Sequence, residues 1–466
     1  MFNEIDLRGF RGFMFKLFKE TPWRWVLCWI IAPAIAVIAM WPVGGPSMAT
    51  PLAVAAMLAF FFSRREAVCL RRVGVVLIFI TIGATYVTRS FNIGLTNIWR
   101  VSDYTGELNL AQAPEYVIGG ILLAATLGLA LWFAPKTKRF HSRDQWIMAI
   151  AMVALVINID NAATASVRGS YKATAPAGEQ IDSAMLQNDI NPSTVEAKNL
   201  VVVIVESWGV PVDPHDVNLE REIWNSDQWS RKYEVAKGTS KYFGSTTNAE
   251  VREWCAVWAD HNSFDFDNSR CLTHLFRDAG FHTTAMHSFK RDFFAREEWY
   301  PKLGFEDVYF DQDLMANGAR FCDGVFAGAC DQDIPQQIGD ILRSSKHDRN
   351  LIYWLTVNAH LPVSADPILD TETCNLGDRE WGEQYSLLCR SYQVHKQVAD
   401  AITIEVMRDD FPESDILIVG DHMPPFFPRS MRVRFNAELV PWIYLKAKSS
   451  DEAAEIDSIT KVALAR

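Results

Sequence analysis

Apolar residues are concentrated in five long runs in the first third of the chain. These runs cover Trp23–Trp41, Met48–Phe62, Val73–Val87, Tyr116–Ala134 and Trp146–Ile159. Each approaches the length of about 20 residues that an α-helix needs to cross a lipid bilayer. The second, third and fifth runs are shorter and would need flanking residues to reach across. The pattern predicts an α-helical membrane domain with five transmembrane helices in residues 1–160.

The segments that connect these runs are alternately rich and poor in cationic side chains. Lysines and arginines are frequent before the first run, between the second and third, and between the fourth and fifth. The other two connections, Pro42–Ser47 and Arg89–Glu115, contain few. The positive-inside rule therefore predicts a cytoplasmic N-terminus and places everything after about Asp160 outside the membrane. A buried helical domain of a soluble protein is the alternative, but it gives no reason for the alternation. Because the first run follows a long polar lead without a small-residue cleavage site, we expect a retained anchor rather than a removed signal peptide.

The rest of the chain has a different pattern, in which short β-branched runs end abruptly at polar residues. Residues 161–197 are rich in Ala, Ser, Thr and Gly, and we interpret them as a linker with one short helix. Expected strands lie within Asn199–Gly209, Phe281–His287, Leu351–His360, Asp415–Phe427 and Pro441–Lys446. One expected helix begins near Ser245, and four others cover Cys271–Ala279, Asp333–Ser345, Trp381–Asp409 and Asp451–Ala465. This alternation predicts an α/β domain in residues 198–466 with a mainly parallel central sheet and helices on both faces.

Charge and cysteine content indicate which partners the second domain can bind and whether it forms disulfides. The net charge of −11 comes mainly from the later part of the chain and argues against a nucleic-acid partner. Six cysteines lie in the domain expected outside the membrane, where disulfides persist. The sequential pairing closes the shortest loops and is the one we favour among the possible connectivities: Cys255–Cys271, Cys322–Cys330 and Cys374–Cys389. A zinc cluster is disfavoured, because the sequence contains no Cys-x-x-Cys.

Residues with catalytic chemistry follow four of the expected strands: Glu206, His287, His360, and the pair Asp421-His422. Each alone is explained as a polar loop residue. Together they are expected to converge, because the carboxyl ends of parallel strands meet at one edge of a sheet. Carboxylate and imidazole ligands suit Zn²⁺ or Mn²⁺. We therefore predict one divalent metal ion at Glu206, Asp421 and His422, with a hydroxyl completing the coordination.

A set of hydroxyls follows Gly244 at an expected helix entry: Ser245, Thr246 and Thr247. Most hydroxyls at such positions cap the helix. One that lies beside a metal ion can instead act as a nucleophile. The remaining histidines, His261 and His395 among them, are interpreted as surface or packing residues.

These residues resemble the membrane-anchored phosphotransferases of the alkaline phosphatase/sulfatase superfamily. That group includes lipoteichoic acid synthase, phosphoethanolamine transferases and periplasmic glucan phosphoglycerol transferases. The resemblance rests on Val205-Glu206-Ser207, Gly244-Ser245-Thr246, Glu250, Ala359-His360-Leu361-Pro362, Gly420-Asp421-His422 and the segment His287…Arg296…Tyr300…Gly304. With the five N-terminal runs, which are typical of the family, it covers nearly the whole chain.

The resemblance implies a specific assignment of roles. Thr246 would be the catalytic nucleophile and a metal ligand beside Glu206, Asp421 and His422. His360, His287 and Arg296 would contact the substrate. The implied reaction moves a phosphoglycerol or phosphoethanolamine head group from a phospholipid to a glycan or glycolipid, through a phosphothreonine. Disulfides in the outside domain and the cationic loops suggest a bacterial inner membrane, with the catalytic domain on the periplasmic or outer side.

The sequence also departs from the patterns of this superfamily. Thr247 and Ser245 are rivals for the role of nucleophile. The segment Val251–Cys255 lacks the Val-Pro-Cys of the lipid A phosphoethanolamine transferases. There is no Cys/Ser-x-Pro-x-Arg, so the formylglycine of true sulfatases has no precursor and sulfate-ester hydrolysis is disfavoured. A phosphodiesterase that uses water as acceptor and a membrane receptor that keeps the fold without catalysis are the alternative functions.

Overall fold

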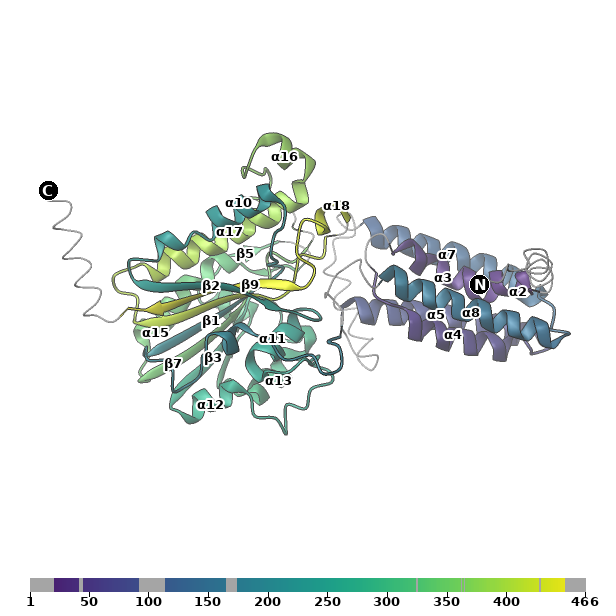
Figure 1. The fold of residues 1–466 in the computed structure, drawn as a ribbon, viewed down its shortest axis with the longest axis horizontal. Helices are drawn as coiled ribbons and strands as arrows, with labels where there is room; N and C mark the ends of the chain where they lie inside the picture. The colour runs from purple at the N-terminus through teal and green to yellow at the C-terminus, as the bar shows by residue number, and fades with distance from the viewer. Residues whose placement is uncertain are drawn as a thin grey trace, which may run out of the picture. The chain divides into compact units, whose positions relative to one another are not determined.

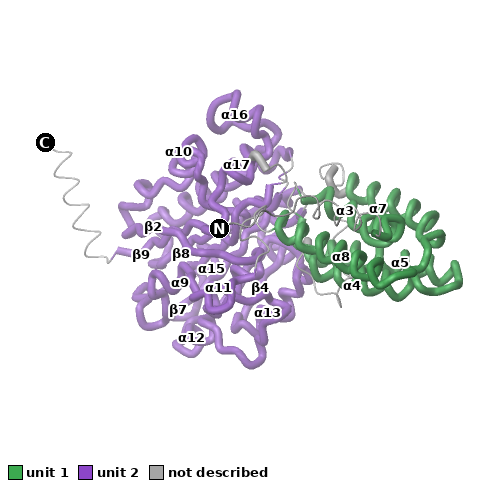
Figure 2. Tube along the Cα trace, turned by 45° about the vertical axis from the view of Figure 1, so that its right-hand side comes forward, with its two compact units in different colours: residues 1–102, 113–167 green, residues 103–112, 168–466 purple. Residues whose placement is uncertain are grey.

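The computed structural model describes residues 21–41, 45–91, 114–164, 174–323, 326–361, 363, 365–426 and 429–448. The chain divides into two compact units (Figure 2). The first contains residues 1–102 and 113–167, and the second contains residues 103–112 and 168–466. The expected helix over Asp451–Ala465 and most of the connection Arg89–Glu115 lie outside the described residues.

The described part of the first unit is entirely helical apart from short connections. Its elements are α2 (Trp23–Val26), the π-helical turn η1 (Leu27–Ile31), α3 (Ala32–Ala39), α4 (Ala49–Phe62), α5 (Val68–Phe91), α7 (Pro114–Phe133), η3 (Ala134–Lys136) and α8 (Arg143–Thr164). Three helices are long and apolar enough to cross a membrane: Val68–Arg89, Val117–Lys136 and Arg143–Thr164. The helical stretches Trp23–Ala39 and Ala49–Phe62 are shorter than that. The unit is thus a helical region with three candidate spans, and the topology with five spans stays a prediction.

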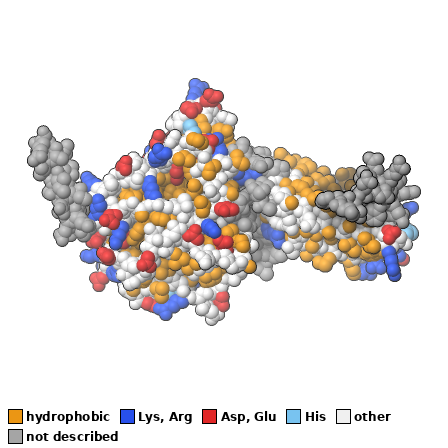
Figure 3. Space-filling view, viewed as in Figure 1, with side chains coloured by type: hydrophobic (Ala, Val, Ile, Leu, Met, Phe, Trp, Pro, Cys, Tyr) orange, Lys and Arg blue, Asp and Glu red, His pale blue; other side chains and the backbone are white. Residues whose placement is uncertain are grey.

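The surface of this helical unit is apolar where a soluble unit would be polar. Met57, Ile121, Trp132 and Ile147 are each more than 60% exposed, and Figure 3 shows hydrophobic side chains across the unit. Such a surface is unfavourable in water and favourable against lipid chains. It agrees with a membrane-embedded region.

A buried acid fixes one end of the helical unit. Asp160 in α8 is fully buried and accepts hydrogen bonds from the Trp41 indole N–H at 2.9 Å and the Met48 backbone N–H at 2.7 Å. A carboxyl group in such a setting needs partners of this kind, because its desolvation is costly. Asp160 therefore holds Trp41 and Met48 against α8.

The second unit is built on a seven-stranded sheet with the order β2-β9-β8-β1-β7-β3-β4 (Figure 1). The strands are β1 (Asn199–Val205), β2 (Tyr233–Lys241), β3 (Phe281–His287), β4 (Asp307–Tyr309), β7 (Arg349–Leu355), β8 (Ser414–Gly420) and β9 (Leu439–Ala447). β1 lies in the centre and pairs in parallel with β7 and β8. β9 is antiparallel to β8 and to the edge strand β2. The prediction of a mostly parallel sheet is confirmed.

Helices cover both faces of this sheet. On one side lie α10 (Pro214–Ile223), α15 (Ile334–Ser344) and α17 (Ser386–Val406), and on the other lie α11 (Thr246–Cys255), α12 (Leu272–Asp278) and α13 (Arg296–Leu303) (Figure 1). Val201, Val203 and Val205 of β1 pack with the first set, while Leu200, Val202 and Ile204 pack with the second. Burial of each such side chain stabilises the fold by about 1.5–3 kcal/mol. This two-sided burial explains the uninterrupted β-branched run in the sequence.

Smaller elements complete the unit and differ in part from expectation. They are α9 (Ala184–Gln187), η4 (Ser226–Gln228), η5 (Phe293–Ala295), α14 (Asp311–Ala316), β5 (Phe321–Cys322), β6 (Gly328–Ala329), η6 (Asp331–Asp333), α16 (Arg379–Gln384) and α18 (Arg429–Arg432). The helix expected over Trp381–Asp409 is broken at Tyr385, whose ψ of 45° is not helical. β2 and α10 were not predicted.

Part of the stretch interpreted as a linker packs inside the second unit. Ala184, Met185, Ile190 and Val195 are buried in the same core as Leu200 of β1. The core of the unit therefore begins well before its first strand.

Three disulfides lie in the second unit, with the sequential pairing Cys255–Cys271, Cys322–Cys330 and Cys374–Cys389. The first joins the end of α11 to the start of α12. Cys28 and Cys69, both in the first unit, are free thiols.

Candidate metal centre and nucleophile

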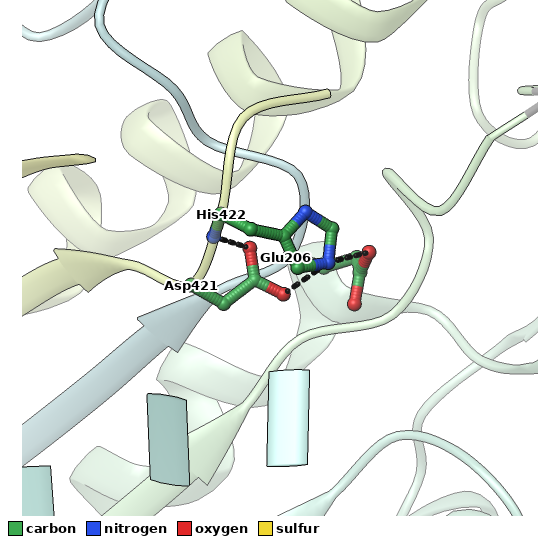
Figure 4. Close-up of side chains that lie close together, drawn as sticks. All are labelled: Glu206, Asp421 and His422. Carbon is green, nitrogen blue, oxygen red and sulfur yellow. Dashed lines mark hydrogen bonds and ion pairs between the residues drawn. The ribbon is translucent and has the colours of Figure 1, made fainter. Parts of the chain in front are cut away.

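Glu206, Asp421 and His422 come together because two neighbouring parallel strands end side by side. Val205 of β1 pairs with Gly420 of β8, so the residues that follow, Glu206 and Asp421, leave the sheet at the same edge. One ligand atom from each of the three side chains lies within 4.8 Å of the others, and all three residues are buried (Figure 4). This is the group of ligands expected from the sequence.

Ser207 donates two hydrogen bonds that hold the two carboxylates in place. The Ser207 N–H donates to Asp421 Oδ1 at 2.8 Å, and the Ser207 hydroxyl donates to Glu206 Oε1 at 2.8 Å. A Cβ on Gly420 would lie 2.0 Å from the carbonyl oxygen of Trp208, so only glycine lets the two strand ends approach this closely. Ser207 thus supports both carboxylates, a role that the sequence analysis did not assign to it.

Thr246 reaches the same point from the first position of helix α11. Its Oγ1 lies 2.9 Å from Asp421 Oδ2, 3.1 Å from Glu206 Oε2 and 3.4 Å from His422 Nε2. The helix starts here because Gly244 adopts a φ of +88°, with Asn248 occupying the space of a Cβ, and Asn248 Oδ1 accepts from the Ser245 N–H at 3.1 Å. The first N–H groups of the helix carry partial positive charge near the hydroxyl. The neighbouring Thr247 is completely buried.

The two carboxylates of this group are buried and repel each other. Burial, and secondly the Asp421 charge, raise the pKa of Glu206, and burial raises the pKa of Asp421 to about 7. Within the described residues, no Lys or Arg forms an ion pair with either carboxylate. His422 Nδ1 lies 3.0 Å from the Met423 carbonyl oxygen, which can only accept, so this nitrogen carries the proton and the Nε2 lone pair faces Asp421 at 3.2 Å. Two oxygen donors and one imidazole nitrogen arranged in this way fit a divalent ion such as Zn²⁺ or Mn²⁺.

The other residues that the resemblance assigns to the substrate lie around this edge. His360 follows β7, and its proximity to Glu206 lowers the pKa of that acid. His287 ends β3; its Nδ1 is 3.2 Å from the Leu355 carbonyl oxygen, while its buried Nε2 has no hydrogen-bond partner among the described residues. Burial, together with the Arg296 charge, holds the pKa of His287 well below its usual value, so the ring is neutral.

Arg296 is placed differently from what a substrate contact requires. It is 1% exposed, and its Nε and Nη2 donate to Glu250 Oε2 at 3.1 and 2.8 Å. Its Nη1 donates to the Phe293 carbonyl oxygen at 3.3 Å. These contacts of Arg296 are internal to the protein, and its role as a substrate ligand stays a prediction.

Two further residues support Glu206, and sequence reasoning did not find them. The Glu206 N–H donates to Thr356 Oγ1 at 2.8 Å, and His395 Nε2 lies 3.1 Å from the Glu206 carbonyl oxygen. His395 comes from α17 and is almost completely buried. In the sequence, His395 is recognisable only as a histidine on an apolar helix face. That pattern does not distinguish a residue that supports the site from any other packed histidine.

Comparison with known proteins gives the family. The sequence pattern of the Sulfatase family matches residues 198–432, which is half of the 466-residue chain and includes Glu206, Thr246 and Asp421-His422. The chain belongs to the sulfatase family. No curated protein matches this sulfatase-family chain significantly.

Solved structures with a related arrangement include three from bacteria. Lipoteichoic acid synthase LtaP from Listeria monocytogenes has 16% identity and a TM-score of 0.43 over 55% of this chain and 67% of that one. The zinc complex of the periplasmic domain of EcEptC from Escherichia coli has 13% identity and a TM-score of 0.37 over 57% and 77%. The phosphoglycerol transferase GacH from Streptococcus pyogenes, in complex with sn-glycerol-1-phosphate, has 14% identity and a TM-score of 0.34 over 55% and 69%.

Metal binding is expected to stabilise the protein in a pH-dependent way. Because burial raises the pKa of Asp421 to about 7, ionising this carboxyl in the metal-free fold costs stability as pH rises from about 4 toward that value. At pH values below this pKa, protons compete with the metal ion for the same carboxylate oxygens. Added Zn²⁺ or Mn²⁺ should therefore raise the unfolding temperature more at a pH of about 7.5 than at about 5.5. Thermal melts at both pH values measure this, and Asp421→Asn should lose most of the metal-dependent rise. An equal rise in that variant would place the ion elsewhere.

Proposed function

We propose that this sulfatase-family protein transfers a phospholipid head group to a hydroxyl of a glycan or glycolipid. The observation that carries the proposal is the position of Thr246. Its hydroxyl is within 3.4 Å of an atom from each of the three candidate metal ligands, at the start of a helix. A hydroxyl in that position is suited to attack phosphorus, and the lack of a formylglycine precursor argues against hydrolysis of sulfate esters.

The chemical steps follow from this placement. Asp421 Oδ2, at 2.9 Å, is positioned to hold the proton of the Thr246 hydroxyl as Oγ1 attacks the phosphodiester. The bond from phosphorus to the diacylglycerol oxygen breaks, that oxygen takes up the proton, and a phosphothreonine carrying the head group remains. An acceptor hydroxyl then attacks phosphorus, the bond to Oγ1 breaks, and Thr246 regains a proton. In sum, phospholipid and acceptor give diacylglycerol and an acceptor that carries the head group through a phosphodiester.

Charge must be compensated in both steps. A divalent ion held by Glu206, Thr246, Asp421 and His422 would lower the pKa of the hydroxyl and offset the charge of the phosphoryl oxygens. The N–H groups at the start of α11 act on the same oxygens. His360, which lies close enough to Glu206 to lower the pKa of that acid, is the residue that we assign to the substrate phosphate, with His287 and Arg296 as further substrate contacts.

The membrane setting supports a lipid donor. The candidate spans and the apolar surface of the first unit would keep the chain at a bilayer, where phospholipid head groups are abundant. We place the protein in a bacterial inner membrane with the site on the outer side. The transferred head group is phosphoglycerol or phosphoethanolamine.

Product analysis tests the proposal directly. The full chain, purified in detergent with Zn²⁺ or Mn²⁺, is incubated with phosphatidylglycerol or phosphatidylethanolamine that carries a labelled head group, and with an oligosaccharide acceptor. We expect diacylglycerol release and label in the oligosaccharide with one donor and not the other. Release of free head-group phosphate without labelled oligosaccharide would make the protein a phosphodiesterase. No consumption of either lipid by a metal-loaded protein would favour a receptor.

A further inference from the structure

Two adjacent charged residues of α11, Arg252 and Glu253, are buried in the core and take no part in the chemistry described above. Each is 1% exposed, and Arg252 Nε donates to Glu253 Oε1 at 2.7 Å. They follow the proposed nucleophile Thr246 on the same helix. Burying such a pair costs several kcal/mol per ion, and apolar side chains of similar volume are often as stable. Stability alone therefore gives no reason for the pair.

The remaining contacts of Arg252 lie on the strand ends around the site. Its Nη2 donates to the carbonyl oxygen of Gly420 at 3.1 Å, and its Nη1 donates to that of Lys241 at 3.4 Å. Gly420 is the last residue of β8 and is bonded directly to Asp421. Arg252 thus connects the helix that carries Thr246 to the strand that carries a candidate metal ligand.

Glu253 extends the connection toward the N-terminal side of the unit. Its Oε2 accepts from the Met185 N–H at 3.0 Å, and its Oε1 accepts from the Ala184 N–H at 3.4 Å. Its carboxylate is therefore held from two sides, and it fixes the direction of the Arg252 guanidinium. A guanidinium presents several donors in a rigid plane, so fixing one edge also fixes the other.

We propose that Arg252 and Glu253 are a positioning pair that sets the separation between Thr246 and Asp421. The contacts close a ring: Thr246 Oγ1 meets Asp421 Oδ2 at 2.9 Å, and the other end of the same helix meets the residue before Asp421 through Arg252. Between these two contacts the chain is continuous helix, which is stiff over this distance. The catalytic consequence rests on the proposed function, whereas the effect on metal affinity does not.

The substitution Arg252→Lys separates positioning from charge. An ammonium keeps the positive charge beside Glu253 but cannot bond to Glu253 and both carbonyl oxygens in the same plane. Supporting residues of a metal site typically change metal affinity or activity by roughly 10–100-fold when substituted. We expect Arg252→Lys to weaken Mn²⁺ or Zn²⁺ binding and to lower kcat by about tenfold or more, with little change in KM for the lipid.

Arg434→Lys is the matched control. Arg434 also forms a buried pair, with Nε and Nη2 at 2.6 and 2.8 Å from the two oxygens of Asp216. Among the described residues, none of its hydrogen bonds or ion pairs reaches the candidate metal ligands. Its substitution should lower the unfolding temperature by a similar amount while metal affinity and kcat stay as in the unsubstituted protein. Glu253→Gln, which keeps an acceptor for the Met185 N–H, should give a smaller change in the same direction as Arg252→Lys.

The measurements are calorimetric titration of the metal-free full chain with Mn²⁺ or Zn²⁺ alone, thermal unfolding, and steady-state kinetics with the active donor. A folded Arg252→Lys protein with unchanged metal affinity and kcat would overturn the proposal, as would equal losses in Arg434→Lys. If Arg252→Lys does not fold, Glu253→Gln decides by the same criteria. If the unsubstituted protein transfers no head group, the proposed function fails, and the metal titrations still decide the positioning role.

Discussion

Thr246→Ala is expected to abolish the covalent intermediate and to lower kcat by about four orders of magnitude or more, as loss of a nucleophile does in other enzymes with a covalent step. The side chain is 8% exposed and hydrogen-bonded within the candidate metal centre, so its removal takes away the proposed attacking oxygen and one proposed metal ligand but little packing. Intact-protein mass spectrometry after incubation with the lipid donor measures the result. The added mass on the unsubstituted protein also identifies the head group.

Thr247→Ala is the control for this experiment. Thr247 is the next residue on the same helix and is fully buried, so its loss should affect folding more than chemistry. We expect the intermediate to form in that variant. An intermediate that survives in Thr246→Ala and vanishes in Thr247→Ala would reassign the nucleophile. Thr246→Ser keeps a hydroxyl and should keep a reduced level of intermediate.

Glu250→Gln is expected to destabilise the second unit by about 3–5 kcal/mol, the typical cost of leaving one charge of a buried pair without its partner. The Glu250 carboxylate is completely buried and accepts from the Arg296 guanidinium, from the Tyr300 hydroxyl, and from the Tyr353 hydroxyl at 2.9 Å. The amide leaves the Arg296 charge in the core without an anion. Thermal unfolding should show a midpoint lower by about 10 °C, given roughly 2–4 °C per kcal/mol for a unit of this size.

An exposed ion pair on the same helix as Arg296 gives the comparison. Lys302 Nζ lies 2.9 Å from Asp267 Oδ2, and both side chains are about half exposed or more. Asp267→Asn should cost less than about 1 kcal/mol, because water replaces the lost partner. The double substitution Glu250→Gln with Arg296→Met should recover part of the loss, since no unpaired charge remains. A Glu250→Gln protein as stable as Asp267→Asn would contradict the assigned role of Glu250.

The residues of the candidate metal centre could be predicted from the sequence because each is marked by a local pattern. A β-branched run followed by an acid marks both β1 and β8, and parallel strands put such ends together without knowledge of side-chain detail. Gly244 before a row of hydroxyls marks the start of α11 in the same way. Each of these signals lies within a few residues of the position that it predicts.

Other features depend on partners far away in the chain and could not be predicted. Arg296 has the same local pattern whether it faces a substrate or pairs with Glu250, and the pairing is decided by the packing of α13 against α11. Strand β2 is a polar edge strand whose side chains are mostly exposed, so it lacks the apolar signal of the central strands. The number of spans was also hard to predict from the apolar runs. The helices formed by the first two runs are shorter than the three candidate spans.

The burial of Ala184, Met185, Ile190 and Val195 determines where the catalytic unit can be cut free of its anchor. A soluble fragment that starts at Lys198, where the family match begins, would lose these four core side chains together with the two N–H groups that bind Glu253. A fragment that starts near Thr174 keeps them. The folded limit of the second unit therefore lies upstream of the point where the family match begins, and a fragment that keeps this core must begin before Ala184.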